Sequence, residues 1–334
     1  MTNEESANSS SIGIDIGTSR IVVARVSDKR YHCESQLNAF ISLPYSRLTE
    51  NLLKQENVFH ETIGRDIVVA GNDAEKFAEV FHVETRRPML NGVLNPQEPH
   101  SLAVVKRIIS KLAGPATVQN QKAFFSVPAP APECEGSLAY HEASCQQILR
   151  EIGYEATPIN EGLAVVFGEM ESSNYTGIGV SCGSGLCNVC LAVLSLPVVS
   201  FSVARAGDFI DQHSATATGD VATRIRVQKE QSFALNGFTS DRVRNALTVY
   251  YGEVIRNLVD ALVEHLSASK RVPRLDNSIP LVISGGTATP KGFLELFRKE
   301  LGARELPVQI SDVRMAPEPL NSTARGALMA ALCQ

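Results

Sequence analysis

The chain has 334 residues, of which 44% are hydrophobic and 20% charged, which is an ordinary composition for a soluble protein of more than one domain. Its net charge of −5 argues against a nucleic-acid-binding surface and against a basic membrane-binding patch. No run approaches the roughly 18 apolar residues of a spanning helix, so no membrane segment is expected. Residues 1–11 are polar and lack the pattern of a signal peptide, which predicts a disordered tail and a cytoplasmic protein.

The stretch 12–26 predicts two short strands joined by a tight polar turn. Asp15 ends the first strand, and the turn carries Gly17, Thr18 and Ser19, whose backbone N–H groups can converge on an anion. A carboxylate beside such a turn suits hydrated magnesium, which takes one or two protein carboxylates. From this stretch alone, an ordinary hairpin with Asp and Gly as turn residues is an equally good interpretation.

The next part of the chain alternates predicted strands and helices, which indicates a mixed α/β architecture. It contains, in order, strands near 31–43 and 66–69, a loop over 86–94, a helix over 102–112, a strand over 123–127 and a helix from Ser137 to Gly153.

The stretch 179–194 repeats the opening hairpin about half a chain later. Gly183 stands where Gly17 stood, and a β-rich strand again follows the turn. The repeat predicts two related halves, each presenting an anion-binding hairpin to one central cleft. It has one defect, because Ser181 occupies the place of Asp15.

The same stretch also spells G-x-S-x-G, which makes Ser181 a candidate nucleophile of a serine hydrolase. That motif requires a strand, a sharp turn and then a helix, whereas residues 186–194 suit a strand. The serine hydrolase therefore stays only as an alternative.

Seven cysteines without a secretory context predict free thiols. Cys182, Cys187 and Cys190 have the spacing of an iron–sulfur site, but the next cysteine, Cys333, lies at the far end of the chain. Burial of the three as small apolar side chains is the favoured interpretation.

The last part of the chain predicts three helices and one strand. The first helix runs from 239–241 to about Leu266, and a buried strand over 280–284 then runs into a Gly-Gly turn. The second helix has Thr289 as N-cap, Pro290 at its first position and Gly302 beyond its end. The third is a short helix over 321–332.

Taken together, these motifs resemble those of the actin, sugar-kinase and DnaK-type ATPase superfamily. Five elements in the family's order carry the resemblance: 15–19, 159–168, 180–188, 282–288 and 324–327. Within the superfamily the chain is most similar to MreB-type bacterial actin-like proteins, because of the segments 87–93 and 200–211.

The resemblance implies an α/β fold with two ribonuclease-H-like (actin-like) domains around a central nucleotide cleft. Domain I would span 12–160, with the C-terminal helix 322–334 packing back on it, and domain II would span 161–321. The small subdomain of the second half is expected to be reduced, because few residues separate Glu230 from Val282.

The resemblance also implies ATP and magnesium as cofactors. Asp15 would hold magnesium through water, and Glu161 would position the attacking water, so these two are the candidate catalytic residues. The candidate phosphate-binding residues are Gly17, Thr18, Ser19, Gly183, Ser184 and Gly185. The remaining candidate nucleotide-binding residues are Gly207, Arg226, Glu230, Gly285, Gly286, Thr287 and Ala288.

The chain departs from the family pattern where Ser181 replaces the second acid and Gly162 replaces a proline. The expected function is that of a slow ATPase that polymerises into cytoskeletal filaments through self-association. The alternative is a non-polymerising nucleotide-binding scaffold that hydrolyses ATP little or not at all.

Overall fold

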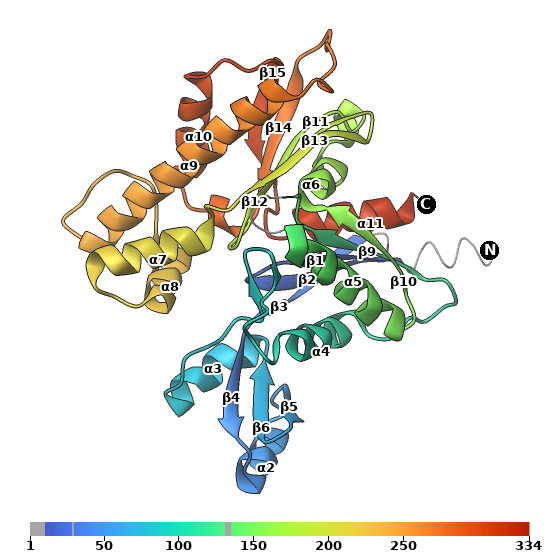
Figure 1. The fold of residues 1–334 in the computed structure, drawn as a ribbon, viewed down its shortest axis with the longest axis vertical. Coiled ribbons are helices and arrows are strands. Elements are labelled where there is room, and N and C mark those ends of the chain that lie inside the picture. Colours follow the sequence, from blue (N-terminus) through green and yellow to red (C-terminus); the bar gives the residue numbers. More distant parts are fainter. Residues whose placement is uncertain (1–10, 29, 131–134, 334) are drawn as a thin grey trace.

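Two five-stranded sheets, one in each half of the chain, form the framework of the protein (Figure 1). The computed structural model describes residues 11–28, 30–130 and 135–333. The first sheet has the order β10 (Glu155–Asn160), β9 (Lys122–Val127), β1 (Ile12–Ile16), β2 (Arg20–Ser27) and β3 (Arg30–Leu37). The second has the order β13 (Leu196–Val203), β12 (Cys187–Val193), β11 (Gly177–Cys182), β14 (Ile279–Ser284) and β15 (Ile310–Met315).

The two sheets share one topology. In each, an opening antiparallel hairpin is extended on one side by a third antiparallel strand and on the other by two parallel strands. Ser181 faces Asn188 across the second hairpin, as Asp15 faces Val22 across the first. The prediction of two related α/β halves is confirmed.

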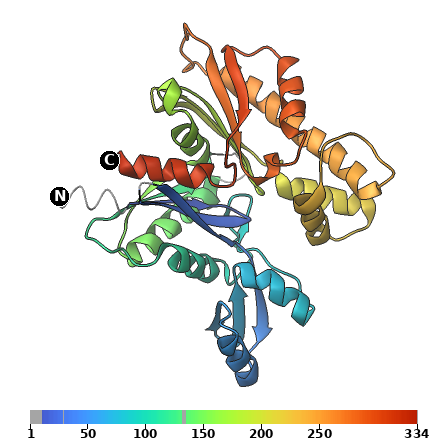
Figure 2. The same ribbon diagram turned by 180° about the vertical axis from the view of Figure 1, so that it is seen from behind.

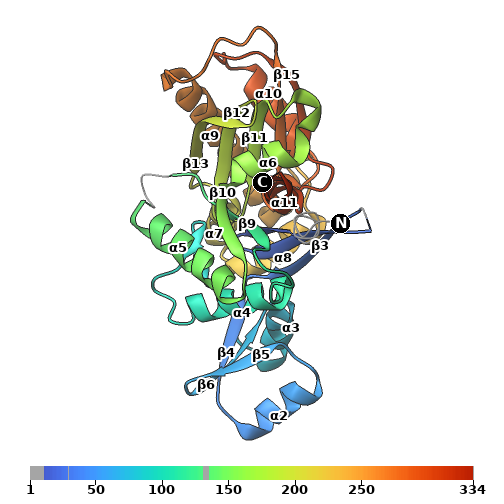
Figure 3. The same ribbon diagram turned by 90° about the vertical axis from the view of Figure 1, so that its right-hand side faces the viewer.

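Helices cover the sheets and join them. α4 (Ser101–Ala113) and α5 (Glu135–Glu151) pack in the first core, and α9 (Arg242–Ala268) and α10 (Phe293–Gly302) pack in the second. α6 (Glu161–Glu169) and α11 (Ser322–Leu332) lie together between the two sheets (Figure 3). α11 contacts β1, β2 and β9, so the C-terminal helix packs against the first sheet.

Each half carries a smaller appendage beside its sheet (Figure 2). In the first half it contains the strands β4 (Phe40–Pro44), β5 (His60–Ile63) and β6 (Asp66–Ala70) with α2 (Arg47–Gln55) and α3 (Asn72–Phe81). The short hairpin β7 (Met89–Leu90) and β8 (Val93–Leu94) leads back to the main body. In the second half the appendage is helical, with α7 (Gly207–Thr218), α8 (Ala222–Ser232) and the start of α9.

The helix expected after the Gly-Gly turn begins later than predicted. α10 starts at Phe293, with Gly292 before it at a φ of 91°, and Gly302 is its last residue rather than the one beyond. The cause is a tertiary contact, because the carbonyl of Lys291 accepts a hydrogen bond from the N–H of Leu235 at 2.7 Å and the chain stays extended there. The helix predicted from Ser137 likewise begins earlier, at Glu135.

The hairpin around Ser181 contradicts the serine-hydrolase alternative. Ser181 lies within strand β11, and the turn after it leads into strand β12 rather than into a helix. A nucleophile elbow needs a helix at that position.

Cys182, Cys187 and Cys190 are fully buried in the apolar cores, as the favoured interpretation predicted. In the described part of the chain, no group of three or more His, Cys, Asp or Glu side chains could hold a metal ion. Of the tail expected over 1–11, residues 1–10 lie outside the described residues, and Ser11 is buried. None of the helices in the described ranges is both long and apolar enough to cross a bilayer.

Candidate functional site

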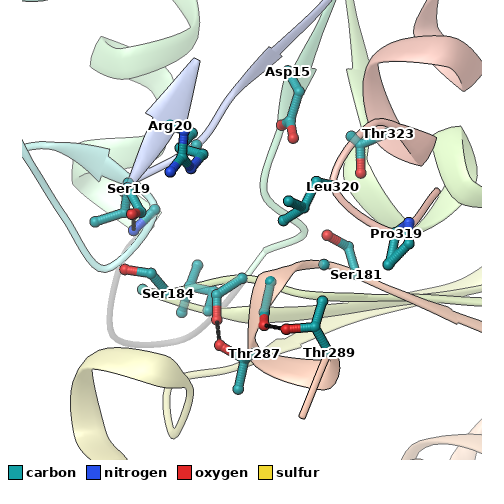
Figure 4. A pocket seen from close by; sticks show the side chains of 18 of the residues that line it. Asp15, Ser19, Arg20, Ser181, Ser184, Thr287, Thr289, Pro319, Leu320 and Thr323 are labelled. Carbon is teal, nitrogen blue, oxygen red and sulfur yellow. Dashed lines mark hydrogen bonds between the residues drawn. The ribbon is translucent and has the colours of Figure 1, made fainter. Parts of the chain in front are cut away.

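A cavity of about 320 Å³ lies between the two halves and is lined by residues from both (Figure 4). Asp15 and Ser19 line it from the first hairpin, and Ser181 and Ser184 line it from the second. Its size and its position between two halves are typical of a small-molecule site.

The two hairpin turns have the same geometry. The N–H of Gly17 donates to the carbonyl of Arg20 at 3.0 Å, and the N–H of Gly183 donates to the carbonyl of Leu186 at 2.9 Å. A Cβ on either glycine would lie 2.9 Å from that same carbonyl oxygen, so both turns require glycine. The sequence repeat therefore reflects a repeated backbone structure at the cavity.

The two turns also meet each other. The hydroxyl of Thr18 accepts a hydrogen bond from the N–H of Gly92 at 3.1 Å, and a Cβ on Gly185 would lie 2.5 Å from that hydroxyl oxygen. Close packing of the two turns thus depends on Gly185 having no side chain.

Two carboxyl groups lie at one side of the cavity, where Glu161 is buried and Asp15 is partly buried. Asp15 accepts a hydrogen bond from the Ser126 hydroxyl at 2.8 Å, and burial raises the pKa of Asp15 to about 6. Burial and the neighbouring Asp15 carboxyl raise the pKa of Glu161 to about 8. A cation beside the two carboxyl groups would favour their charged forms. The pair is therefore a suitable place for a divalent cation.

Ser181 has a defined partner. Its hydroxyl donates to Oε2 of Glu161 at 3.1 Å, so the residue that stands in place of an acid orients the Glu161 carboxyl. Gly162 is explained by packing, since a Cβ there would lie 2.6 Å from the backbone nitrogen of Cys190. α6 approaches β12 too closely for a larger residue.

Basic side chains line the cavity near the second turn, and each has an acidic partner. Arg87 pairs with Asp208 at 2.6 Å, and the buried Lys229 pairs with Asp211 at 2.7 Å. Arg226 of α8 forms an ion pair with Glu75 of α3, which joins the two appendages across the cleft. Since each cation already has an acidic partner, a polyanion can contact these side chains only through N–H groups that the acids leave unoccupied.

The Gly-Gly turn after β14 forms a third wall. Gly285 has a φ of 93°, which favours glycine, and the Thr287 hydroxyl donates to the carbonyl of Gly183 at 2.7 Å. Gly286 is exposed, and a Cβ there would meet only the Leu320 side chain, at 3.3 Å. The turn is thus fixed to the second hairpin, and one bare face of its backbone is open to the cavity.

The structure brings most of the candidate site residues to this one cavity. Those that line it are Asp15, Gly17, Thr18, Ser19, Glu161, Gly183, Ser184, Gly185, Arg226, Glu230, Gly285, Gly286 and Thr287. Gly207 lies behind the wall against Ser184 and Thr287, and Ala288 is buried in the second core. Further lining residues that the sequence did not single out as site residues are Arg20, Val22, Arg87, Gly92, Leu186, Asp211, Lys229, Thr289, Pro319, Leu320 and Thr323.

These residues fit a magnesium nucleotide. Two opposed glycine turns can donate N–H groups to phosphates, and the acidic pair supplies the oxygen ligands that magnesium prefers. Because few protein carboxylates are present, the phosphates themselves would complete the metal's coordination. The bare face at Gly286 can lie against a flat base.

Comparison with known protein families matches this chain to one model. The family described as Volactin matches residues 10–331. No curated protein sequence gave a match.

Solved structures with the same fold include three actin-like proteins. The MamK double helical filament has a TM-score of 0.71 and 19% identity, over 96% of this chain and 98% of that chain. MreB5 of Spiroplasma citri bound to ADP has a TM-score of 0.64 and 15% identity, over 94% of each chain. The ethanolamine utilization protein EutJ from Carboxydothermus hydrogenoformans has a TM-score of 0.55 and 18% identity, over 96% of this chain and 89% of that chain. The fold is therefore that of the actin-like ATPases.

Proposed function

Because the chain belongs to the Volactin family and has the actin-like fold, we propose that it binds ATP with magnesium between its two halves, hydrolyses ATP slowly and assembles into filaments. The observation that carries this proposal is the cavity that both glycine turns and the Asp15–Glu161 pair line together. The MamK filament and the nucleotide-bound MreB5 structures support it by analogy of fold. A cytoplasmic location is part of the same proposal.

In this proposal the protein promotes ATP hydrolysis mainly by positioning the reacting groups and by stabilising charge. Gly17 to Ser19 and Gly183 to Gly185 hold the phosphates from two sides, and Asp15 holds the magnesium through water. The magnesium ion supplies positive charge that offsets the charge developing on the transferred phosphoryl group. Glu161, oriented by Ser181, positions the attacking water.

A second candidate function is that of a nucleotide-binding scaffold with little or no hydrolysis and no polymer. Ser181 favours it, since a neutral hydroxyl cannot supply the negative charge of an acid beside Asp15 and Glu161. The two candidates share the nucleotide site and differ in turnover and assembly.

The experiment that separates them measures light scattering and phosphate release together, after ATP and magnesium are added to the full chain. The proposed filament-forming ATPase gives a rise in scattering and slow phosphate release, and Asp15→Ala diminishes both. Nucleotide binding without scattering or phosphate release would instead support the scaffold.

A further inference from the structure

Arg87 belongs to the first half of the chain, but its side chain contacts the second. It lies just before the β7–β8 hairpin, and its Nη1 donates to the hydroxyl of Ser184 at 2.8 Å and to Oδ1 of Asp208 at 2.6 Å. Ser184 belongs to the second glycine turn and Asp208 to the first turn of α7. A guanidinium from one half is thus anchored at the candidate phosphate site of the other.

This anchoring uses only one nitrogen of the guanidinium. A guanidinium carries five N–H donors, and Nε and Nη2 of Arg87 have no hydrogen-bond partner among the described residues. The side chain is only 22% exposed and lines the cavity. Donors on a mostly buried cation are therefore left over beside the second turn.

The Ser184 hydroxyl cannot serve a ligand in the same way. Its one O–H donates to Asp208 at 2.8 Å, and its oxygen accepts from Arg87. The N–H of Gly183 already donates to Leu186, so the donors that remain for an anion at this turn are the backbone N–H groups of Ser184 and Gly185 and the unused N–H groups of Arg87.

Arg87 also differs from the other arginine near a glycine turn. Arg20 lines the cavity from the first hairpin, but its side chain forms no hydrogen bond with any described residue. Arg87 is held in place by two partners, so less side-chain entropy is lost when it binds a ligand.

We propose that Arg87 binds the terminal phosphate of the nucleoside triphosphate, so that the first half of the chain distinguishes a triphosphate from a diphosphate at the second turn. This inference rests on the proposed nucleotide site. Planar guanidinium groups bind phosphate oxygens with two parallel hydrogen bonds, and Nε and Nη2 are arranged for that contact. A diphosphate lacks the terminal group and leaves Arg87 with Ser184 and Asp208 alone.

The test is calorimetric titration of ATP and of ADP, each with magnesium, into the parent and into Arg87→Gln and Arg87→Lys. Loss of a charge-assisted phosphate contact should weaken ATP binding to Arg87→Gln about tenfold or more, while ADP affinity stays within about twofold of the parent. Arg87→Lys keeps the positive charge but loses the planar guanidinium with its two parallel N–H donors. Its ATP affinity should therefore lie between that of the parent and that of Arg87→Gln. Arg107→Gln, which removes an exposed arginine of α4, is the matched control and should bind both nucleotides as the parent does.

Two results would overturn the assignment of Arg87 and leave the proposed site standing. One is an equal loss of ATP and ADP affinity in both variants, which would mean that Arg87 only stabilises the conformation of the second turn. The other is unchanged ATP affinity in folded Arg87→Gln. If the parent itself binds neither nucleotide, the proposed function fails, and the role of Arg87 fails with it.

Discussion

Ser181 is the position at which the second hairpin lacks the acid of the first. The first hairpin presents the Asp15 carboxyl to the cavity, and the second presents a hydroxyl that donates to Glu161. This arrangement leaves two acids rather than three near the proposed metal. Ser181 therefore sets how much negative charge the protein itself offers to magnesium.

Restoring the repeat with Ser181→Asp should make the protein depend more on magnesium. A third carboxyl beside Asp15 and Glu161 adds like-charge repulsion, which a divalent cation relieves. We expect a lower melting temperature without magnesium, a larger rise when magnesium is added, and faster ATP turnover. Melting curves and phosphate release across a magnesium titration measure this. Parent-like curves in both assays would show that the missing acid does not limit the site.

His141, which does not line the cavity, makes the stability of the protein depend on pH. It is fully buried on α5, with the sulfur of Cys145 3.8 Å from its Nδ1, and burial lowers its pKa from 6.5 to about 4. The folded protein keeps His141 neutral, whereas the unfolded chain binds a proton below about pH 6.5. The stability that neutral His141 allows is present above pH 6.5 and is lost as the pH falls toward 4.

We therefore predict that His141→Leu reduces the loss of unfolding free energy between pH 7 and pH 5 by about 2 kcal/mol relative to the parent. Urea unfolding at the two pH values measures the difference. His32→Gln, at an exposed histidine, should behave as the parent does. An identical pH dependence in the parent and His141→Leu would mean that His141 is not the acid-sensitive group.

Most residues that line the cavity could be predicted from the sequence, because glycine turns and a carboxyl group near the end of a strand are local signals. Arg87, Lys229 and Asp211 were harder to assign to the site. Their roles come from ion pairs between residues far apart in the chain, such as Arg87 with Asp208. No local pattern reports such a pairing.

At the scale of elements, the two halves are joined where α6 crosses α11. A Cβ on Gly326 of α11 would lie 1.7 Å from the carbonyl oxygen of Ala164 in α6, and one on Gly168 would lie 2.9 Å from the carbonyl oxygen of Ser322. In both cases the added Cβ would collide with a backbone atom of the other helix. A larger residue can therefore be accommodated only if one helix moves.

Gly326→Ala should destabilise the protein by about 2 kcal/mol or more, because overpacking at a backbone contact forces the helices apart. Gly302→Ala at the end of α10 is the control, since a Cβ there meets nothing within 4 Å and alanine favours a helix. Urea unfolding of the two variants measures the difference. Equal stability of Gly326→Ala and the parent would contradict the close crossing of α6 and α11.

Elements with strong periodicity or clear caps were predicted from the sequence, and elements set by tertiary contacts were not. The long helix begins after its Asp241 cap and α4 ends before Gly114, as expected. α10 begins later than its Thr-Pro signal indicates, because Lys291 pairs with Leu235 in a distant loop. The short α2 and α3 were not foreseen, since nine or ten residues carry little periodic signal.

At the scale of the whole molecule, the internal repeat in the sequence predicted the architecture of two halves around one cavity. The links that span that cavity come from both halves, with Arg87 bound to Asp208 and Arg226 bound to Glu75. A ligand in the cavity would touch both halves at once. Nucleotide binding and the relative position of the halves should therefore be coupled.

The most direct test of the nucleotide site is calorimetric titration of magnesium ATP into the parent and into Gly286→Val. A side chain at Gly286 meets only Leu320, so the variant should fold while its side chain projects into the space proposed for the base. We predict one site per chain in the parent and affinity about tenfold weaker or worse in Gly286→Val. No binding to the parent, or parent-like affinity in folded Gly286→Val, would contradict the nucleotide site described here.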